Sequence, residues 1–460
     1  MCAAGVSAAA TLLGATPAAA ARGSEESKPP ASAKAKVGLV FTHRPPEEPT
    51  WPNRGYDYEG RKRELTERLR LACPSIDFVP TTVQNAEEAT KLLESAQDLD
   101  GFVVYMVGIW TGAGRAIAVT KRPTIFVDDL YAGSGEFLIE YSRARREELP
   151  VVGVASSRFE DVADAVNCFD CLAQLRSATI LDVMDHAPPP TAAAITDVCG
   201  TRVQRVTSDE FKQAYDAADV QEARQWAQRW MSEAEKVVEP SREVIEQSGH
   251  MYVTMRNLMQ QHGARAITID CLGLLYGGKL PAYPCLGYSQ LNNDGFIGAC
   301  ESDLRSTITM LAGTSLIGRP GFISDPVIDT AKNQIIYAHC VAPTKVYGPT
   351  GPTNPCHIRS HSEDRKGAVL RSLMPLNETV TTALLDPTRR AMVMHQGKSV
   401  ENVDEDKACR TKLACTVPDA EKLLADWDLW RWHRVTFYGD HKRRFTQLAT
   451  LLGCKVVQEG

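Results

Sequence analysis

Short apolar runs alternate with amphipathic segments over the first third of the chain, and this pattern predicts repeated β-α units. The run 37–42 is typical of a buried strand, and the charged positions of 59–71 face outward from a predicted helix. Four further strands of the same kind are predicted at 76–79, 101–105, 124–127 and 151–154. Repeated β-α units form a parallel sheet with helices on both faces. We therefore expect an α/β domain over residues 37–175.

A second set of such signals follows the proline-rich turn at 186–190. Strands are predicted at 202–206 and 266–270, on either side of a long helical region. The run 295–300 is expected to lead into a helix over 301–317, and 321–324 is expected to be the next strand. The sequence thus predicts a second α/β domain over residues 176–335, which would carry the candidate carboxylates discussed below.

Beyond this point strand-like runs separated by Pro and Gly turns dominate, and helical patterns are scarce until 443–452. The strand-like runs lie at 334–340, 391–394, 414–417 and 433–438. We expect a β-rich, barrel-like or sandwich-like domain over residues 336–460. The predicted fold class is therefore α/β, with two Rossmann-like parallel-sheet domains followed by a β-rich, barrel-like C-terminal domain.

The segment 1–36 resembles an export signal followed by a linker. An apolar stretch at 6–13 precedes several alanines, as in a cleavage site, but no Lys or Arg precedes it. This favours an incomplete twin-arginine-like signal and export to the periplasm; an Ala-rich tail on a cytoplasmic protein is the alternative. Cleavage would remove Cys2 and leave an even number of the 13 cysteines. Disulfides would then be conceivable, but most cysteines lie in apolar contexts typical of buried thiols.

Composition narrows the classes of partner. The 460 residues are 43% hydrophobic and carry a formal net charge of −6, which disfavours nucleic acid as a partner because phosphate binding needs a basic surface. Outside the N-terminus no apolar run approaches the ~18 residues of a membrane span. These features leave a soluble, multidomain α/β protein.

Two carboxylates follow strand-like runs in the second predicted domain. Glu301 begins the expected helix, where the helix dipole would lower the proton affinity of its carboxylate. Pro326 favours an extended backbone at Asp325, so that this carboxylate can project from the end of a strand. Carboxylates on consecutive β-α units can converge at one edge of a sheet. Without further signals, a helix-start charge at Glu301 and a turn residue at Asp325 are the better explanation of the pair.

Three segments closely resemble motifs of the L-fucose isomerase and L-arabinose isomerase superfamily, namely 295–304, 318–326 and 432–440. The resemblance covers roughly residues 37–460 in domain order. It implies that Glu301 and Asp325 are the catalytic carboxylates and that both, with His433, bind one divalent ion. Two carboxylates and one imidazole suit Mn²⁺ best, with Mg²⁺ or Co²⁺ as alternatives. A histidine that merely packs within a strand is the other interpretation of His433.

Four further residues are candidates for substrate binding. His361 and Arg365 lie in a polar stretch that could bind sugar hydroxyls, and Arg44 and Trp110 resemble family positions that close the pocket across a subunit boundary. His339 is more typical of a core residue or of an indirect role. The resemblance also implies a homo-oligomer, trimeric or hexameric.

The resulting hypothesis is a metal-dependent aldose–ketose isomerase that converts a free sugar, such as L-fucose or D-arabinose, through a cis-enediol. Two alternatives remain open. One is an exported sugar-binding protein without catalysis, and the other is a metal-dependent aldolase or lyase that acts on a modified sugar.

Overall fold

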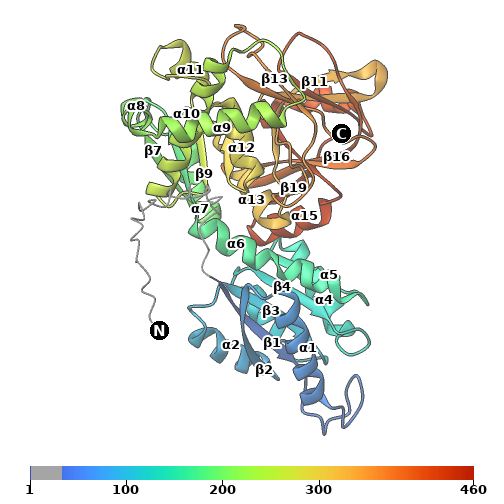
Figure 1. Cartoon of the computed structure of the whole chain (residues 1–460). Coiled ribbons are helices and arrows are strands. Elements are labelled where there is room, and N and C mark those ends of the chain that lie inside the picture. Colours follow the sequence, from blue (N-terminus) through green and yellow to red (C-terminus); the bar gives the residue numbers. More distant parts are fainter. Residues whose placement is uncertain (2–33) are drawn as a thin grey trace.

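The computed structural model describes Met1 and residues 34–460, so most of the expected export segment, with Cys2, lies outside the described residues and export stays a prediction. Figure 1 shows two lobes, of which the lower contains β1 to β4 and the upper contains the later sheets and the C-terminus. Between them, α6 (Cys168–Ser177) contacts both β1 and α13. Within the described part of the chain, no helix is long and apolar enough to cross a membrane.

The lower lobe is the first predicted α/β unit. Its five strands are all parallel, in the order β2-β1-β3-β4-β5. The strands are β1 (Ala35–Thr42), β2 (Ile76–Val83), β3 (Gly101–Met106), β4 (Thr124–Asp128) and β5 (Val151–Val154). The helices are α1 (Tyr58–Ala72), α2 (Ala86–Ser95), α3 (Ala113–Ala118), α4 (Ser134–Arg146) and α5 (Phe159–Val166). All five predicted strands are confirmed.

The second sheet has four parallel strands in the order β10-β9-β6-β7. They are β6 (Thr179–Val183), β7 (Arg202–Val206), β9 (Ala266–Ile269) and β10 (Ile297–Ala299). The helices of this part are α7 (Pro190–Cys199), α8 (Ser208–Ala217), α9 (Val220–Glu233), α10 (Arg242–Gln261), α11 (Cys271–Tyr276), α12 (Cys285–Asn293) and α13 (Leu304–Ile317). The sequence analysis missed β6, one of the two inner strands, in which the buried Asp182 interrupts the apolar run.

The C-terminal part is a closed antiparallel barrel of strands in the order β15-β18-β11-β12-β17-β16, closed by the pairing of β15 with β16. Its strands are β11 (Phe322–Asp329), β12 (Gln334–His339), β15 (Thr379–Asp386), β16 (Ala391–Asn402), β17 (Thr411–Thr416) and β18 (Arg434–Tyr438). The remaining elements are β8 (Lys236–Val237), β13 (Cys356–Arg359), β14 (Val369–Ser372), α14 (Ala420–Asp426), α15 (Lys442–Leu451) and β19 (Lys455–Gln458). The predicted fold class, two parallel-sheet α/β units followed by a barrel, is confirmed.

One strand differs from its prediction. The run 321–324 was expected to continue the second parallel α/β unit, but β11 pairs antiparallel with β12 and β18 and is part of the barrel. The reason lies in the connection, because a short turn, with Asn333 in the left-handed region, joins β11 to β12 as a hairpin. An apolar run by itself does not distinguish parallel from antiparallel pairing. The domain boundaries at 175 and 335 stay a prediction.

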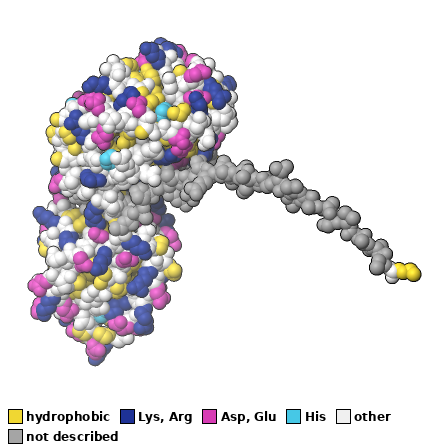
Figure 2. Space-filling model, turned by 60° about the vertical axis from the view of Figure 1, so that its left-hand side comes forward, with side chains coloured by type: hydrophobic (Ala, Val, Ile, Leu, Met, Phe, Trp, Pro, Cys, Tyr) yellow, Lys and Arg dark blue, Asp and Glu magenta, His cyan; other side chains and the backbone are white. Residues whose placement is uncertain are grey.

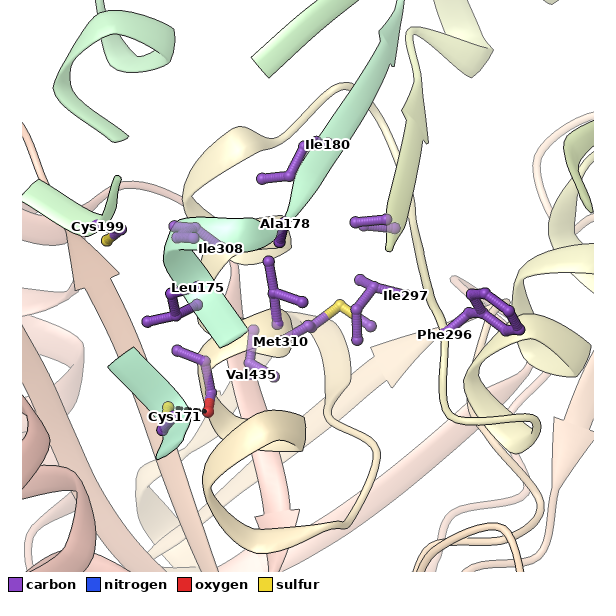
Figure 3. Packing of buried hydrophobic residues seen from close by; sticks show 14 of the residues in the cluster. Cys171, Leu175, Ala178, Ile180, Cys199, Phe296, Ile297, Ile308, Met310 and Val435 are labelled. Atoms are coloured by element: carbon purple, nitrogen blue, oxygen red, sulfur yellow. Dashed lines mark hydrogen bonds between the residues drawn. The ribbon is translucent and has the colours of Figure 1, made fainter. Parts of the chain in front are cut away.

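A continuous core joins the second sheet to the barrel. Figure 3 shows side chains from both sides of this junction, including Leu175 of α6, Ile297 of β10, Ile308 and Met310 of α13, and Val435 of β18. All five belong to one cluster, and each is at most 1% exposed. Because β10, α13 and β18 share this core, the residues that follow or precede them are held in a fixed relative position.

Candidate metal and active site

A cavity of about 480 Å³ lies where the second sheet meets the barrel. Glu301 reaches it from the segment after β10, Asp325 from β11, and His339 from the end of β12. His433, directly before β18, lies behind these groups and contacts Asp325 and Glu301. The structure therefore brings together all three residues that the sequence analysis assigned to a divalent ion.

Glu301 lies in a tight turn, so the expectation that it begins a helix is wrong. The backbone of Glu301 and of Ser302 is left-handed, with φ of 63° and 51°, and α13 begins only at Leu304. Asp303 is the N-cap, and its carboxylate accepts hydrogen bonds from the first-turn backbone N–H groups of α13. The Ser302 hydroxyl donates to Asp182 of β6 at 2.5 Å, and this bond fixes the turn against the sheet.

The pKa values of Glu301 and Asp325 are shifted in opposite directions. Burial raises the pKa of Glu301; His433 opposes this shift, and the nearby charges of Asp325 and Asp303 add to it. The expected lowering by a helix dipole is wrong, because Glu301 is not on the helix. Burial also disfavours the charge of Asp325, but the hydrogen bond with His433 and the nearby His339 hold the pKa of that carboxyl below its usual range. The site thus pairs a carboxyl group of raised pKa with one of lowered pKa.

Each ring nitrogen of His433 lies at hydrogen-bond distance from a carboxylate. Its Nδ1 lies 3.1 Å from Asp303 Oδ2, and its Nε2 lies 3.1 Å from Asp325 Oδ1 and 3.7 Å from Glu301 Oε2. Burial would lower the pKa of His433, but the two hydrogen bonds outweigh it and raise the pKa to about 10. The metal-free ring is therefore protonated at neutral pH.

Glu301, Asp325 and His433 offer donor atoms of the kinds that a divalent ion binds. A metal-binding histidine generally donates its second ring N–H to a carboxylate, which is the relation of His433 to Asp303. A metal at Nε2 would replace the proton now shared with Asp325, and Glu301 Oε2 lies nearby as a further oxygen donor. Two carboxylate oxygens and one imidazole nitrogen are ligands that Mn²⁺, Mg²⁺ and Co²⁺ accept.

His339 has a more central place than the sequence indicated. It is 3% exposed, and it belongs to both groups of described residues whose potential ligand atoms all lie within 4.8 Å of one another, Cys300–Glu301–His339 and Asp325–His339–Cys409; His433 belongs to neither group. Burial lowers the pKa of His339 to about 4, so the ring is neutral. Its Nε2 lies 3.9 Å from Glu301 Oε1 and has no hydrogen-bond partner among the described residues.

Of the four predicted substrate-binding residues, one lines the cavity and three do not. His361 lines the cavity, whereas Arg365 is exposed and forms an ion pair with Asp406 at 2.7 Å, outside the cavity wall. Arg44 and Trp110 lie on the lower lobe, where Arg44 Nη1 is 3.4 Å from the Trp110 carbonyl oxygen. Trp110 is 56% exposed, and neither residue lines the cavity of its own chain.

The sequence analysis did not identify three residues that hold the side chains or the turn of the site in place. Trp432 Nε1 donates to Asp325 Oδ1 at 2.6 Å, Asp303 binds His433, and Asp182 anchors the turn of Glu301. Only Asp303 carries a local signal, as a capping residue before a helical pattern. Each partner lies more than one hundred residues away in the chain, so no local pattern could have identified it.

The cavity wall is acidic and rich in thiols. Its carboxylates are Glu301, Asp325 and Glu363, and no Lys or Arg occurs among the described residues that line it. Five cysteines contribute to the wall, namely Cys271, Cys285, Cys300, Cys340 and Cys409. The twelve described cysteines are free thiols, and all except Cys409 are buried.

A scan against models of known protein families finds no match. The chain is similar to proteins named sulfoquinovose isomerase from Alkalicoccus urumqiensis, with 24% identity over 197 residues, and from Priestia aryabhattai, with 23% identity over 238 residues. These matches cover 40% and 49% of this chain and 42% and 52% of the relatives. A stretch of 57 residues is 44% identical to the protein of that name from Clostridium sp. (strain MSTE9) and covers 12% of this chain and 13% of that relative. The chain thus spans about half the length, or less, of the relatives that it matches.

Proposed function

We propose that this protein is a metal-dependent aldose–ketose isomerase that acts on a free, open-chain sugar. The observation that carries the proposal is the convergence of Glu301 and Asp325 on His433 Nε2, at 3.7 and 3.1 Å, while Asp303 binds the opposite nitrogen of the ring. The partial similarity to relatives named as isomerases of a sugar supports the same reaction class.

The two carboxylates have different tasks in this reaction. Glu301, whose pKa is raised, can accept the proton at C2 of the sugar and return it to C1 of the resulting cis-enediol. Asp325, whose pKa is held low, stays an anion and serves as a ligand. A divalent ion held by Glu301, Asp325 and His433 would polarise the carbonyl group and acidify the neighbouring C–H bond. Mn²⁺ is the proposed ion, with Mg²⁺ and Co²⁺ as alternatives.

The cavity wall favours an uncharged sugar. Three carboxylates and no cationic side chain among the described lining residues would repel an anionic group, which agrees with a substrate such as L-fucose or D-arabinose. Sulfoquinovose, named in the relatives, carries a sulfonate and would need a cation from elsewhere. Arg44, beside the exposed Trp110, could supply it from a neighbouring copy in a trimer or hexamer, an assembly that light scattering would test.

The test is an activity assay on metal-loaded protein. The full chain is stripped with a chelator, reloaded with Mn²⁺ and assayed with L-fucose, D-arabinose and sulfoquinovose. We expect one of these aldoses to yield its ketose, and we expect Glu301→Gln to lower kcat by about 10²–10⁴-fold, the usual contribution of a positioned acid or base. Glu421→Gln, on the exposed first turn of α14, is the matched control.

Three outcomes would contradict the proposal or part of it. Sugar binding that survives chelation, without turnover of any aldose, would identify a binding protein. Products of carbon–carbon cleavage in the mass spectrum would identify an aldolase. Full activity of the Glu301→Gln variant would disprove the role of Glu301.

A further inference from the structure

Two buried histidines face each other at the cavity but have different hydrogen bonds. The ring centroids of His339 and His433 are 5.6 Å apart. Both side chains come from the barrel, and both are at most 5% exposed. By proximity alone, each could be a metal ligand. Their hydrogen-bond partners show which of the two histidines has a nitrogen lone pair available for a metal.

His433 has the partners of a metal ligand. Its Nδ1 faces the Asp303 carboxylate, which can only accept a hydrogen bond, so Nδ1 carries a proton. Loss of the second ring proton leaves a lone pair on Nε2, directed at Asp325 and Glu301. The ring can thus bind a cation without any change in its outer hydrogen bond.

His339 has the opposite arrangement. The backbone N–H of Cys340 donates to His339 Nδ1 at 2.9 Å. A backbone N–H can only donate, so Nδ1 has no proton and the neutral ring carries its proton on Nε2. A protonated Nε2 cannot bind a metal. For His339 to act as a ligand, its proton would have to move to Nδ1, where two donors would then face each other.

The Nε2–H group of His339 lacks an acceptor within the chain. Glu301 Oε1 is the nearby carboxylate oxygen, but at 3.9 Å it is beyond hydrogen-bond distance. No other partner occurs among the described residues, and the group is buried at the cavity wall. Buried donors are nearly always paired in folded proteins, so this one indicates an acceptor that arrives with a ligand.

We propose that His339 is a hydrogen-bond donor to the sugar and not a ligand of the metal. This inference rests on the proposed isomerase function. As Glu301 takes the proton from C2, negative charge develops on the oxygen at C1, and His339 Nε2–H donates to that oxygen. The proton stays on the imidazole, and the electron pair of the broken C–H bond forms the enediolate. A neutral imidazole is able to polarise a carbonyl group in this way.

The first experiment measures metal affinity without any sugar. Mn²⁺ is titrated into the chelator-treated full chain by calorimetry, for the wild type and for His339→Leu, His339→Gln and His433→Gln. We expect both His339 variants to bind Mn²⁺ within about threefold of the wild type. His433→Gln should lose more than the about 10–100-fold that an outer-shell partner contributes. Equal large losses for His339 and His433 variants would overturn the inference.

The second experiment separates a donor from a structural side chain. Leu removes the donor at similar size, whereas the Gln amide can place an N–H near the position of Nε2. We expect His339→Leu to lower kcat by about 10²–10³-fold, as loss of one oxyanion donor does, and His339→Gln to recover at least about tenfold. Equal activity of the two variants would contradict the proposed donor.

A third measurement keeps the inference separate from the proposed function. Ring ¹⁵N shifts of histidine-labelled wild-type protein report the tautomer directly, and the His339→Gln spectrum assigns the signal. A protonated Nε2 and an unprotonated Nδ1 are expected. A protonated Nδ1 would overturn the inference even if the sugar is isomerised, whereas failure to turn over any aldose would disprove the function and leave the tautomer assignment standing.

Discussion

At the scale of single residues, the site is defined by the partners of a few titratable groups. The motif resemblance identified Glu301, Asp325 and His433, but it did not identify Asp303, which binds His433 from 130 positions away. Nor did it give the direction in which the pKa of Glu301 is shifted. That pKa is raised because Glu301 is buried within a left-handed turn. Residue identity was predictable from local motifs, whereas the environment of each residue was not.

The buried carboxyl group of Asp182 predicts that the stability of the fold depends on pH. Asp182 is fully buried, and burial raises its pKa from 3.8 to about 7, even though the Ser302 hydroxyl donates to it. A raised pKa means that the folded state binds a proton more tightly than the unfolded state. The contribution of Asp182 to stability is therefore fully present below pH 3.8, decreases as the pH rises towards 7, and is constant above that value.

We expect Asp182→Asn to remove this pH-dependent loss, because the amide cannot ionise but still accepts the Ser302 hydrogen bond. The free energy of unfolding of the variant, relative to the wild type, should rise between pH 5 and pH 8 by at most about 3 kcal/mol. Urea unfolding at both pH values measures it. A difference that stays the same at the two pH values would show that Asp182 does not titrate in this range.

At the scale of helices and strands, apolar runs predicted the strands of the first sheet because β1, β3, β4 and β5 are buried along nearly their whole length, whereas the edge strand β2 alternates buried and exposed positions at its start. The same signal failed for β11, since an antiparallel barrel strand can also read as a short apolar run. The start of α13 was misplaced by three residues. There Asp303, and not Glu301, satisfies the first backbone N–H groups.

The barrel contains a buried ion pair that offers a stability test. Arg434 of β18 is fully buried, and its Nη2 lies 2.6 Å from Glu459 Oε1, while Glu459 Oε2 lies 3.1 Å from His395 Nδ1. Burial opposes the charge of Glu459, but the hydrogen bonds from His395 and Arg434 lower its pKa to about 2. The stabilisation is thus present above pH 4.5 and is lost as the pH falls towards 2.

We expect Glu459→Gln to lower the free energy of unfolding at pH 7 by about 3–5 kcal/mol, because Arg434 would remain buried without a counter-charge. Glu421→Gln on an exposed helix should change it by less than about 0.5 kcal/mol. Chemical denaturation of both variants gives the comparison. Equal stability of the two would mean that the Arg434–Glu459 pair contributes little to the barrel.

At the scale of the whole molecule, the candidate site depends on the junction between the second sheet and the barrel. The face in Figure 2 shows acidic and basic side chains interspersed over both lobes, in keeping with the small net charge. Glu301 follows the last strand of the parallel sheet, while Asp325 and His433 belong to the barrel or border it. No single domain could therefore form the three-residue site, and the order of domains along the chain could not reveal this.

The most direct test of the account is the position of a bound metal ion. The full chain, crystallised with Mn²⁺, is examined by anomalous diffraction at the manganese absorption edge. The account predicts one strong peak about 2 Å from a Glu301 oxygen, an Asp325 oxygen and His433 Nε2, and outside bonding distance of His339 Nε2. A peak at another place in the chain, or no peak in protein that turns over an aldose, would contradict the central claim.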